Sequence, residues 1–390
     1  MARIVVVGGG FAGYSALKTL HKRGVTERHE VVLVDPSTHF VYLPSLPYLL
    51  TRKKSIDDIT ASLGDIARRL GATHVRDAVT HVDAESRRLH LESGEALSYD
   101  KLIICAGAQP EYYGVPGAET ALPAWRLPHY LRIMDRLERG AGRIIVVGGG
   151  LTGVEVAGEL LERLGPGNVT IIERMDHLLP FLNSRKASEI AWKFLHGKGL
   201  EIVLGAGVSS VEDGRGVVLD DGRRLEGDAV IWTVGIRASS ISIEPEPQRK
   251  GRGWLEVDDY LRVQGVKDIY AAGDASLFSV DGAYACKMAE EALLQGRTAA
   301  VNVALEIAGA KPAERHTPLF RTDRSRTLLS IGFNKGIAVW DSIVFSGGLP
   351  YTAKMLIESA VMRDVKGRML GDLLTGMEVA FIKTLNLLTG

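Results

Sequence analysis

The first 35 residues hold the pattern that most restricts the fold of this chain. A run of β-branched residues from Ile4 to Val7 ends in the sequence GGGFAG, residues 8–13. Helical spacing follows, then a second strand pattern at 31–34, which Asp35 closes. A strand, a GxGxxG turn, a helix and a second strand that ends in an acid are typical of a dinucleotide-binding unit.

Each glycine of this turn has its own expected task. Gly8 makes the tight turn, Gly10 lets backbone N–H groups approach a pyrophosphate, and Gly13 lets the helix close on the strand. The N-terminus of the helix would face the phosphates. Asp35 would hold the hydroxyl pair of a ribose. A glycine turn that binds nothing is the competing interpretation.

The same fingerprint occurs a second time. A strand at 143–147 ends in GGGLTG, residues 148–153, and a helical pattern at 154–164 and a strand at 169–172 follow. Glu173 closes the second strand as Asp35 closes the first. Two dinucleotide sites in one chain predict two cofactors that exchange electrons. The expected fold class is therefore α/β with two Rossmann-like dinucleotide-binding domains, followed by a C-terminal α+β segment.

The second site predicts a preference between pyridine nucleotides. Gly148, Gly150 and Gly153 would hold the pyrophosphate, and Glu173 the adenosine ribose. An acid at this place disfavours a 2′-phosphate, so NADH is expected over NADPH. Arg174 beside it weakens that preference.

Composition excludes several other classes. A chain of 390 residues is expected to hold two or three domains. Its 47 basic and 47 acidic residues provide no excess of positive charge for nucleic acid. Its two cysteines, Cys105 and Cys286, form no CxxC pair, which argues against a disulfide scaffold, a cysteine zinc site and a paired-cysteine redox centre. No metal site is expected.

Targeting signals are also absent from the sequence pattern. The N-terminus begins directly with a strand and has no charged segment before an apolar one, so we expect no signal peptide and a cytosolic location. No apolar run is long enough to span a bilayer.

Local sequence pattern predicts the secondary structure of the segments outside the two fingerprints. The proline- and aromatic-rich stretch 36–47 predicts a rigid, extended loop, and the spacing at 56–70 predicts a helix. A strand at 102–105 ends in the small residues Ala106 and Gly107, where backbone can lie close to a ligand. A polar stretch at 244–253 is expected to be a surface loop or hinge.

The last third begins with a strand and a long helix. The strand ends in Gly273 and Asp274, and the helix is expected over 288–307. Two strands at 328–331 and 336–339 and several helices should follow. The final helix, 370–388, has one apolar face, which suits dimer or core packing or a bilayer interface.

With these motifs, the chain resembles the two-dinucleotide-binding-domain flavoproteins of the pyridine-nucleotide oxidoreductase type. The resemblance implies that the first fingerprint and the Gly273–Asp274 motif bind FAD, with Asp274 at the ribityl–phosphate region. It implies that the second fingerprint binds NAD(P)H in an inserted domain. The implied boundaries are 1–112 and 255–320 for the FAD domain, 113–254 for the NAD(P)H domain, and 321–390 for a membrane-surface or dimerisation segment.

Within this superfamily, the chain is most similar to the type II NADH dehydrogenases, which are single-chain NADH:quinone oxidoreductases that do not pump protons. The similarity lies in GVEVAGEL at 153–160, WTVG at 232–235 and LLSIGFNKGIAVWD at 328–341. It implies FAD and NADH as cofactors and a quinone as acceptor. It also implies peripheral attachment to the cytoplasmic face of the membrane, with homodimer formation left open.

The resemblance also implies roles for individual residues. Further cofactor contacts would come from Phe11, Ala12, Pro44, Ala106, Gly107, Gly235, Gly273, Asp274 and Ala289.

Glu155, one of the pair Glu290 and Glu291, and Lys287 are candidates for catalysis, each with a competing interpretation. Glu155 would lie beside the nicotinamide and flavin, or favour the helix dipole from the first turn. Glu290 or Glu291 would supply protons to quinone, or form a solvated helix face. Lys287 would stabilise an anionic reduced flavin, or have a purely structural role.

Three local features depart from the type II pattern. The family's AQxAxQQ motif is AEEALLQ here, residues 289–295. Cys286-Lys287 and the PSLPY run at Pro44 look more like sulfide:quinone oxidoreductases. Those enzymes need a cysteine pair at the flavin and typically have a degraded second nucleotide site, so the NADH interpretation is preferred. The remaining alternatives are a soluble ferredoxin or rubredoxin reductase and a redox-sensing flavoprotein with negligible turnover.

Overall fold

The computed structural model describes residues 1–368 and divides into two compact units. The first unit contains residues 1–41, 60–109 and 237–323, and the second contains 42–59, 110–236 and 324 onward. The final helix that the sequence predicts at 370–388 lies outside the described residues. The predicted domain boundaries remain a prediction, and each unit is treated by itself below.

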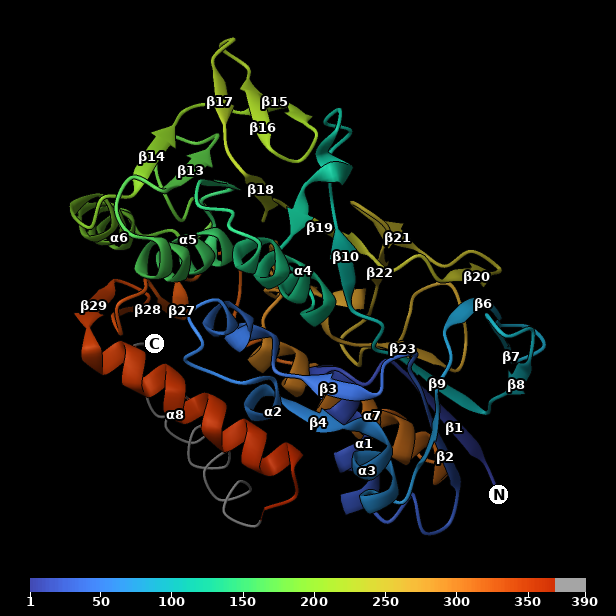
Figure 1. Cartoon of the computed structure of the whole chain (residues 1–390). Coiled ribbons are helices and arrows are strands. Elements are labelled where there is room, and N and C mark those ends of the chain that lie inside the picture. The colour runs from blue at the N-terminus through green and yellow to red at the C-terminus, as the bar shows by residue number, and fades with distance from the viewer. Residues whose placement is uncertain (369–390) are drawn as a thin grey trace. The chain divides into compact units, whose positions relative to one another are not determined.

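A five-stranded parallel sheet forms the centre of the first unit, in the order β23-β9-β1-β2-β5 (Figure 1). Its strands are β1 (Arg3–Val7), β2 (Glu30–Val34), β5 (Thr73–Val75), β9 (Lys101–Ile104) and β23 (Ile269–Ala271). The central strands are apolar and buried along nearly their whole length, as expected for parallel strands covered on both faces. The predicted strand–turn–helix–strand unit and the α/β class are confirmed.

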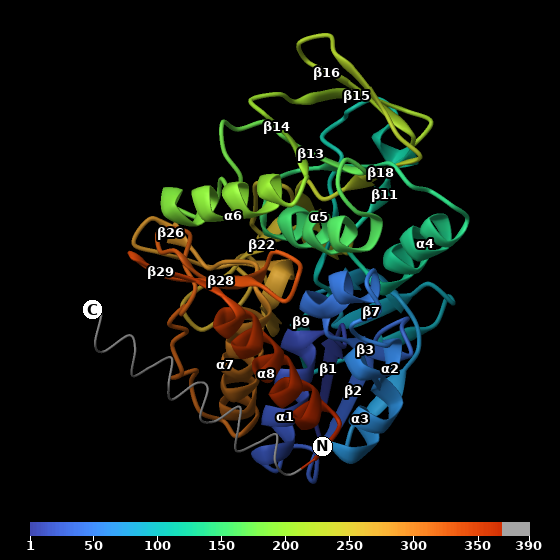
Figure 2. The same ribbon diagram turned by 60° about the vertical axis from the view of Figure 1, so that its left-hand side comes forward.

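Two helices of the first unit pack through bare backbone. α1 (Phe11–Lys22) and α7 (Ala289–Ile307) lie side by side in both Figure 1 and Figure 2. A Cβ on Gly296 would lie 2.1 Å from the carbonyl oxygen of Ala12, so the two helices approach where neither places a side chain between them. This contact holds the start of α1 against α7.

The remaining strands of the first unit are short. A four-stranded sheet has the order β20-β6-β7-β8, and three small sheets complete the unit. Their bounds are β3 (His39–Val41), β4 (Thr60–Ser62), β6 (Val79–Asp83), β7 (Arg88–Leu91), β8 (Ala96–Ser98), β20 (Ser242–Glu244), β21 (Arg249–Lys250), β22 (Trp254–Glu256), β24 (Ser276–Leu277), β25 (Ser279–Val280) and β26 (Ala283–Tyr284). The expected loop at 244–253 therefore holds one strand and the end of another.

Two predictions for residues 36–70 are wrong. The expected extended loop contains β3 and the 3₁₀ helix η1 (Leu43–Leu49), and the expected single helix is split into α2 (Ile56–Ile59) and α3 (Leu63–Arg69) by β4. The pairing of β4 with β3 places Ala61 opposite Phe40, and the Ser62 hydroxyl then caps α3 by accepting the Asp65 N–H at 3.2 Å. A long-range strand pairing overrides the local helical spacing here.

The second unit has its own five-stranded parallel sheet, in the order β11-β18-β12-β13-β14. Its strands are β11 (Leu122–Pro123), β12 (Ile144–Val147), β13 (Val169–Glu173), β14 (Glu201–Leu204) and β18 (Ala229–Trp232). The helices are α4 (Leu127–Glu138), α5 (Leu151–Leu164) and α6 (Arg185–Gly197), and a three-stranded antiparallel sheet adds β15 (Val208–Glu212), β16 (Gly216–Leu219) and β17 (Arg224–Glu226). The second predicted Rossmann-like unit is thus confirmed.

The second unit ends in a small sheet and a long helix. The sheet is an antiparallel meander of β27 (Arg326–Ser330), β28 (Gly336–Trp340) and β29 (Ile343–Gly347), and α8 (Gly348–Val365) packs on it. The chain passes between the units near β10 (Ala108–Pro110) and β19 (Ile236–Ala238), and the short 3₁₀ turns are η2 (Ala118–Thr120) and η3 (Gly273–Ala275). Of the helices in residues 1–368, none combines the length and apolar character needed to cross a membrane.

Candidate nucleotide sites and a buried charge network

The turn after β1 takes its shape from two glycines. Gly8 has a φ of +99°, and a Cβ on it would lie 2.3 Å from the carbonyl oxygen of Cys105. A Cβ on Gly13 would lie 1.8 Å from the carbonyl oxygen of Gly8. Apart from its own chain neighbours, no atom of residues 1–368 would lie within 4 Å of a Cβ on Gly10. Gly8 and Gly13 are therefore needed by the fold itself, whereas Gly10 leaves room for a ligand to approach the backbone.

The start of α1 suits an anion. Its N-cap residue, Gly10, makes no side-chain cap, and its first turn contains no acidic side chain. Phe11 and Ala12 are buried, and the Phe11 ring meets Phe40 edge-on with 5.2 Å between centroids. A fixed helix N-terminus of this kind attracts a phosphate.

The acid that follows β2 is bonded to the glycine turn. The Gly9 N–H donates to Asp35 Oδ2 at 2.7 Å, and the Ser37 N–H donates to Oδ1 at 2.7 Å. Each carboxylate oxygen can accept a further hydrogen bond. The half-buried Asp35 therefore both braces the turn and retains capacity for the hydroxyl pair of a ribose.

A glutamine that sequence analysis gave no role fixes the turn after β23. The Gln295 side-chain oxygen accepts the N–H of Gly273 at 2.8 Å and the hydroxyl of Ser276 at 3.0 Å. Gly273 has a φ of +69°, and a Cβ on it would lie 3.1 Å from the Cβ of Ala12. Gln295 thus holds the residue before Asp274 against the first turn of α1.

These residues share one edge of the sheet in the first unit. Gly8, Asp35, Ala106 and Gly273 follow β1, β2, β9 and β23, and parallel strands end at a common edge. Ligands of open α/β sheets bind at this edge. The structure therefore brings together Gly8, Gly10, Phe11, Ala12, Gly13, Asp35, Ala106, Gly107, Gly273 and Asp274.

The start of α7 carries three more predicted residues. Ala289 is its first residue, Glu290 lies half-buried in its first turn, and Lys287 precedes it by two positions. The Lys287 ammonium donates to the carbonyl oxygen of Ser276. Burial lowers the pKa of Lys287 to about 8, although the Asp274 carboxylate opposes that shift.

Glu291 does not form the solvated helix face that was one interpretation of this segment. Its side chain is fully buried, and it accepts from His316 Nε2 at 2.6 Å, Leu319 N–H at 3.0 Å and Phe320 N–H at 3.2 Å. These bonds hold the 316–320 segment against α7. The solvated-face interpretation is wrong for Glu291 because the burial of α7 leaves that face without solvent.

The second unit repeats the glycine geometry of the first. Gly148 has a φ of +104°, and a Cβ on Gly153 would lie 1.8 Å from the carbonyl oxygen of Gly148. In the described part of the chain, a Cβ on Gly150 would meet no atom within 4 Å beyond its chain neighbours. Glu173 Oε2 accepts the Gly149 N–H at 2.7 Å, as Asp35 accepts the N–H of Gly9. The second turn is thus built to hold a dinucleotide in the same way.

Two further predicted contacts lie elsewhere in the second unit. Gly235 has a φ of +67° and packs so closely against Tyr113 that a Cβ would lie 2.3 Å from its hydroxyl oxygen. Pro44 lies at the start of η1. Their contact with a cofactor remains a prediction.

Glu155 is held by protein groups from two distant segments. It accepts hydrogen bonds from the Lys354 ammonium on α8 and from the Ser330 N–H on β27 at 2.9 Å. The helix starts at Leu151 rather than at 154, so Glu155 is in the second turn and the first-turn dipole interpretation is wrong. Its contact with nicotinamide remains a prediction.

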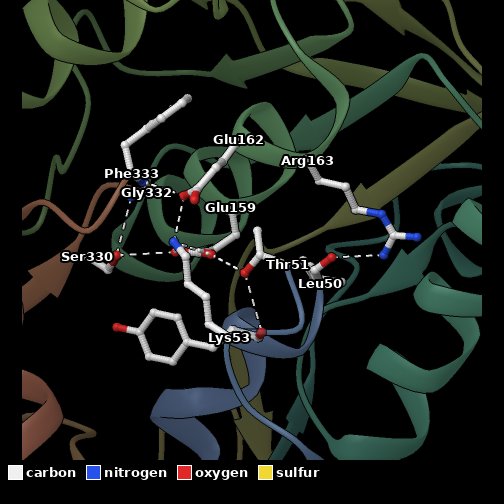
Figure 3. A network of polar contacts seen from close by, with 10 residues as sticks. Leu50, Thr51, Lys53, Glu159, Glu162, Arg163, Ser330, Gly332 and Phe333 are labelled. Carbon is white, nitrogen blue, oxygen red and sulfur yellow. Dashed lines mark hydrogen bonds and ion pairs between the residues drawn. The ribbon is translucent and has the colours of Figure 1, made fainter.

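Two more carboxylates continue this row along α5 (Figure 3). Glu159 accepts from the Thr51 hydroxyl at 2.6 Å and pairs with the Lys53 ammonium at 3.0 Å. Glu162 pairs with the same ammonium at 2.6 Å and also accepts the Phe333 N–H at 2.5 Å. The intervals of four and three residues between these acids place them on one face of the helix.

This network fastens α5 to three other segments of the second unit, which are 42–59, the region of β27 and α8. Glu159 is fully buried, and desolvation raises the pKa of its carboxyl. Removing one member of a buried ion pair leaves a charge that nothing compensates, which is strongly destabilising. Sequence analysis missed Lys53, Glu159 and Lys354, although three acids on one face of an otherwise apolar helix are a signal that could have indicated buried partners.

The duplicated glycine turn, each copy at the end of a parallel sheet and each braced by an acid, defines an oxidoreductase with two dinucleotide units. Comparison with known sequences agrees with this class. The profile described as pyridine nucleotide-disulphide oxidoreductase matches residues 2–306. The chain belongs to this family, and it is an oxidoreductase.

Two relatives and one solved structure make the comparison specific. The chain is 32% identical to an NADH dehydrogenase-like protein of Mycobacterium tuberculosis over 90% of this chain and 91% of that protein. It is 27% identical to a type II NADH:quinone oxidoreductase of the same organism, over 98% of this chain and 88% of the relative. The sulfide:quinone oxidoreductase of Aquifex aeolicus superimposes with a TM-score of 0.79 at 15% identity, covering 94% and 92% of the two chains. At that identity the superposition shows the fold alone.

Proposed function

We propose that this protein oxidises NADH with a bound FAD and passes the two electrons to a quinone. The observation that carries the proposal is the second glycine turn, which has the same glycine geometry and the same acid-to-backbone bond as the first. The relatives named NADH dehydrogenase-like protein and NADH:quinone oxidoreductase support NADH as donor and quinone as acceptor.

The residues at the first sheet edge fit FAD. Gly10 and the start of α1 would hold the pyrophosphate, Asp35 the adenosine ribose and Asp274 the ribityl–phosphate region. FAD would accept a hydride and release electrons to the acceptor, which is chemistry that no side chain of this chain supplies. The task of the protein is to orient the nucleotides at reacting distance and to exclude water.

The residues of the second turn fit NADH. Gly150 and the start of α5 would hold its pyrophosphate, and Glu173 would take the ribose hydroxyls. Both oxygens of Glu173 already accept backbone N–H groups, since Oε1 accepts from Met175 at 2.8 Å. A 2′-phosphate would bring more negative charge to this buried carboxylate, which favours NADH over NADPH.

The two cysteines argue against the sulfide:quinone alternative. Cys105 is buried at the end of β9, and burial raises the pKa of its thiol. Burial also raises the pKa of the Cys286 thiol to about 11. The thiolate is the reactive form of cysteine, so neither residue is poised to carry sulfur near neutral pH.

Anaerobic stopped-flow spectroscopy of the FAD-loaded protein tests the proposal. The flavin absorbance is recorded after mixing with NADH, NADPH or sulfide, and then with a short-chain quinone. We expect fast bleaching by NADH, slower bleaching by NADPH and fast recovery with quinone. Bleaching by sulfide alone would overturn the proposal, and bleaching by NADH without recovery would overturn its quinone half.

We further propose that the enzyme acts at a membrane surface, where quinones reside. Supporting this, three large apolar side chains on β29 and α8 are more than half exposed: Phe345 is 63%, Leu349 81% and Leu356 65% exposed. A flotation assay with vesicles tests this attachment, and replacement of these three residues with serine should weaken it. Light scattering tests homodimer formation, for which the predicted apolar face at 370–388 is the candidate.

A further inference from the structure

A pair of histidines lies on the outer face of the four-stranded sheet β20-β6-β7-β8 in the first unit (Figure 1). His81 on β6 is directly opposite His90 on β7, and the next pair along the two strands, Val82 and Leu89, is fully buried. Since successive side chains of a strand point to opposite faces, the two histidines share the face turned away from the core. His90 is exposed and His81 is half-buried. Strand pairing thus joins two imidazoles that are nine positions apart in the sequence.

The separation of the two rings suits one metal ion between them. Their centroids are 5.5 Å apart, and the ring planes are inclined by 44° to each other. An ion at about 2.1 Å from one nitrogen of each ring would hold the centroids about 5 to 6 Å apart. Neutral imidazole is the commonest metal ligand in proteins, and it suits Zn²⁺ and Ni²⁺. The two rings are therefore at the separation that one shared ion requires.

A serine on β20 fixes the tautomer of His81. The Ser242 hydroxyl donates to the carbonyl oxygen of Thr80 at 3.2 Å, because a carbonyl oxygen can only accept. The same hydroxyl oxygen lies 2.9 Å from His81 Nδ1, so in this contact the Nδ1–H donates to the hydroxyl. A neutral His81 then carries its proton on Nδ1 and presents a lone pair on Nε2. Metal-binding histidines are oriented in this way, by a partner on the nitrogen that does not ligate.

The neighbours on this face leave space for an ion and its waters. Ala96 on β8 lies opposite His90 and presents only a methyl group. The neighbouring pair on the same face, Asp83 and Arg88, brings one charge of each sign. In residues 1–368, no group of three or more histidine, cysteine or acidic side chains is arranged to hold a metal. Two imidazoles would therefore share the ion with water, which predicts an exchangeable site.

We propose that His81 and His90 together bind one divalent transition-metal ion of the Zn²⁺ or Ni²⁺ class on the surface of the first unit. Each imidazole donates an electron pair from one ring nitrogen to the ion, and water molecules fill the remaining positions. The bound ion links β6 to β7 and so stabilises the four-stranded sheet. The candidate FAD residues follow strands of a different sheet, so this inference does not depend on the proposed function.

Isothermal titration calorimetry with NiCl₂ and with ZnCl₂ tests the inference, on the full-length protein purified without a histidine tag. We expect the parent to bind one ion per chain, and His81→Ala and His90→Ala each to lose that binding. Ser242→Ala should keep the stoichiometry and bind the ion about 10- to 100-fold more weakly, because His81 loses the partner that orients it. Binding should also weaken at acid pH, since a protonated imidazole cannot ligate.

His39→Ala is the matched control. His39 is also an exposed histidine on a strand of the first unit, but Ser62 rather than a histidine lies opposite it. Its replacement should leave both the stoichiometry and the affinity unchanged. Thermal melting gives a second readout: Ni²⁺ should raise the melting temperature of the parent and of His39→Ala but not that of His81→Ala or His90→Ala, and all four should melt alike in EDTA. Equal affinity in the parent and in either of the last two variants, or no binding by the parent, would overturn the inference.

Discussion

The two glycine turns of this protein are nearly identical in backbone geometry, but the helices that follow them contact different partners. In both turns, a Cβ on the last glycine would lie 1.8 Å from the carbonyl oxygen of the first, and an acid accepts an N–H at 2.7 Å. α1 then packs on α7 through bare backbone at Gly296. α5 also has a close backbone contact, since a Cβ on Gly158 would lie 2.7 Å from the carbonyl oxygen of Ile331. In addition, α5 presents Glu155 to the buried Lys354 and Glu159 to the half-buried Lys53.

The comparison separates what the nucleotide requires from what the surrounding unit requires. A dinucleotide fixes the turn, because the backbone must approach the pyrophosphate closely in both units. The outer face of each helix can then contact partners of its own. α1 meets another helix and needs small residues there. α5 meets α8 and the 42–59 segment through ion pairs, and β27 through a hydrogen bond from a backbone N–H. The following predictions test this division, from the largest expected effect to the smallest.

Of the variants considered, Lys354→Met should cause the largest loss of stability of the second unit. It leaves Glu155 buried without its cation, and breaking a buried pair in this way costs about 3–5 kcal/mol. Urea denaturation measures the loss of stability. The double variant Lys354→Met/Glu155→Gln removes the uncompensated charge and should recover most of that stability. No recovery would mean that Lys354 acts through packing rather than through its charge.

Gly13→Ala and Gly153→Ala should each weaken the binding of a different cofactor. Each new Cβ would lie 1.8 Å from a carbonyl oxygen, and overpacking of this kind typically costs about 1–3 kcal/mol. Gly13→Ala should lose FAD, measured by absorbance of the purified protein. Gly153→Ala should keep FAD but lose bleaching by NADH. If both variants lost the same cofactor, the assignment of one nucleotide to each turn would be wrong.

Gln295→Leu should loosen the FAD site without changing the second turn. It leaves the Gly273 N–H without its acceptor, and an unsatisfied buried polar group costs about 1–3 kcal/mol. The expected result is weaker FAD retention on gel filtration. Affinity for NADH, measured by equilibrium dialysis, should stay within about twofold, a difference of less than 1 kcal/mol. Gln295→Glu restores an acceptor and should recover part of the FAD retention.

The smallest effect is a pH dependence of stability. Burial raises the pKa of Glu159, so the folded state binds its proton more tightly than the unfolded state does. Its contribution to stability is complete below the unfolded pKa of about 4.3 and is lost as pH rises through the folded pKa. Thermal melting should show Glu159→Gln gaining stability relative to the parent over that range.

Asp228 provides a control of opposite sign. Backbone N–H groups of Arg143 and Gly142 lower the pKa of its exposed carboxyl. Its contribution is present above the unfolded pKa and is lost as pH falls through the folded pKa. Asp228→Asn should therefore be less stable than the parent near neutral pH, and this difference in stability should disappear at low pH. If the two variants changed in the same direction, the charge of Glu159 would not be the cause.

Local sequence predicted the parts of the fold in which neighbouring residues decide. The β-branched runs, both glycine turns and the acids Asp35 and Glu173 lie where the pattern placed them, because steric demands within a few residues fix such a unit. The roles of Glu290 and Lys287 could not be derived in this way. Those roles depend on what lies opposite them in space.

Tertiary structure decided the rest. Glu155 is bonded to a lysine 199 residues away, and Glu159 to a threonine 108 residues away. The predicted helix at 56–70 was split because Thr60–Ser62 pairs with a strand that precedes it by about twenty residues, a non-local contact that outweighs local helical propensity. No local pattern encodes such partners, since a buried charge is stable only when folding brings its counterion to it.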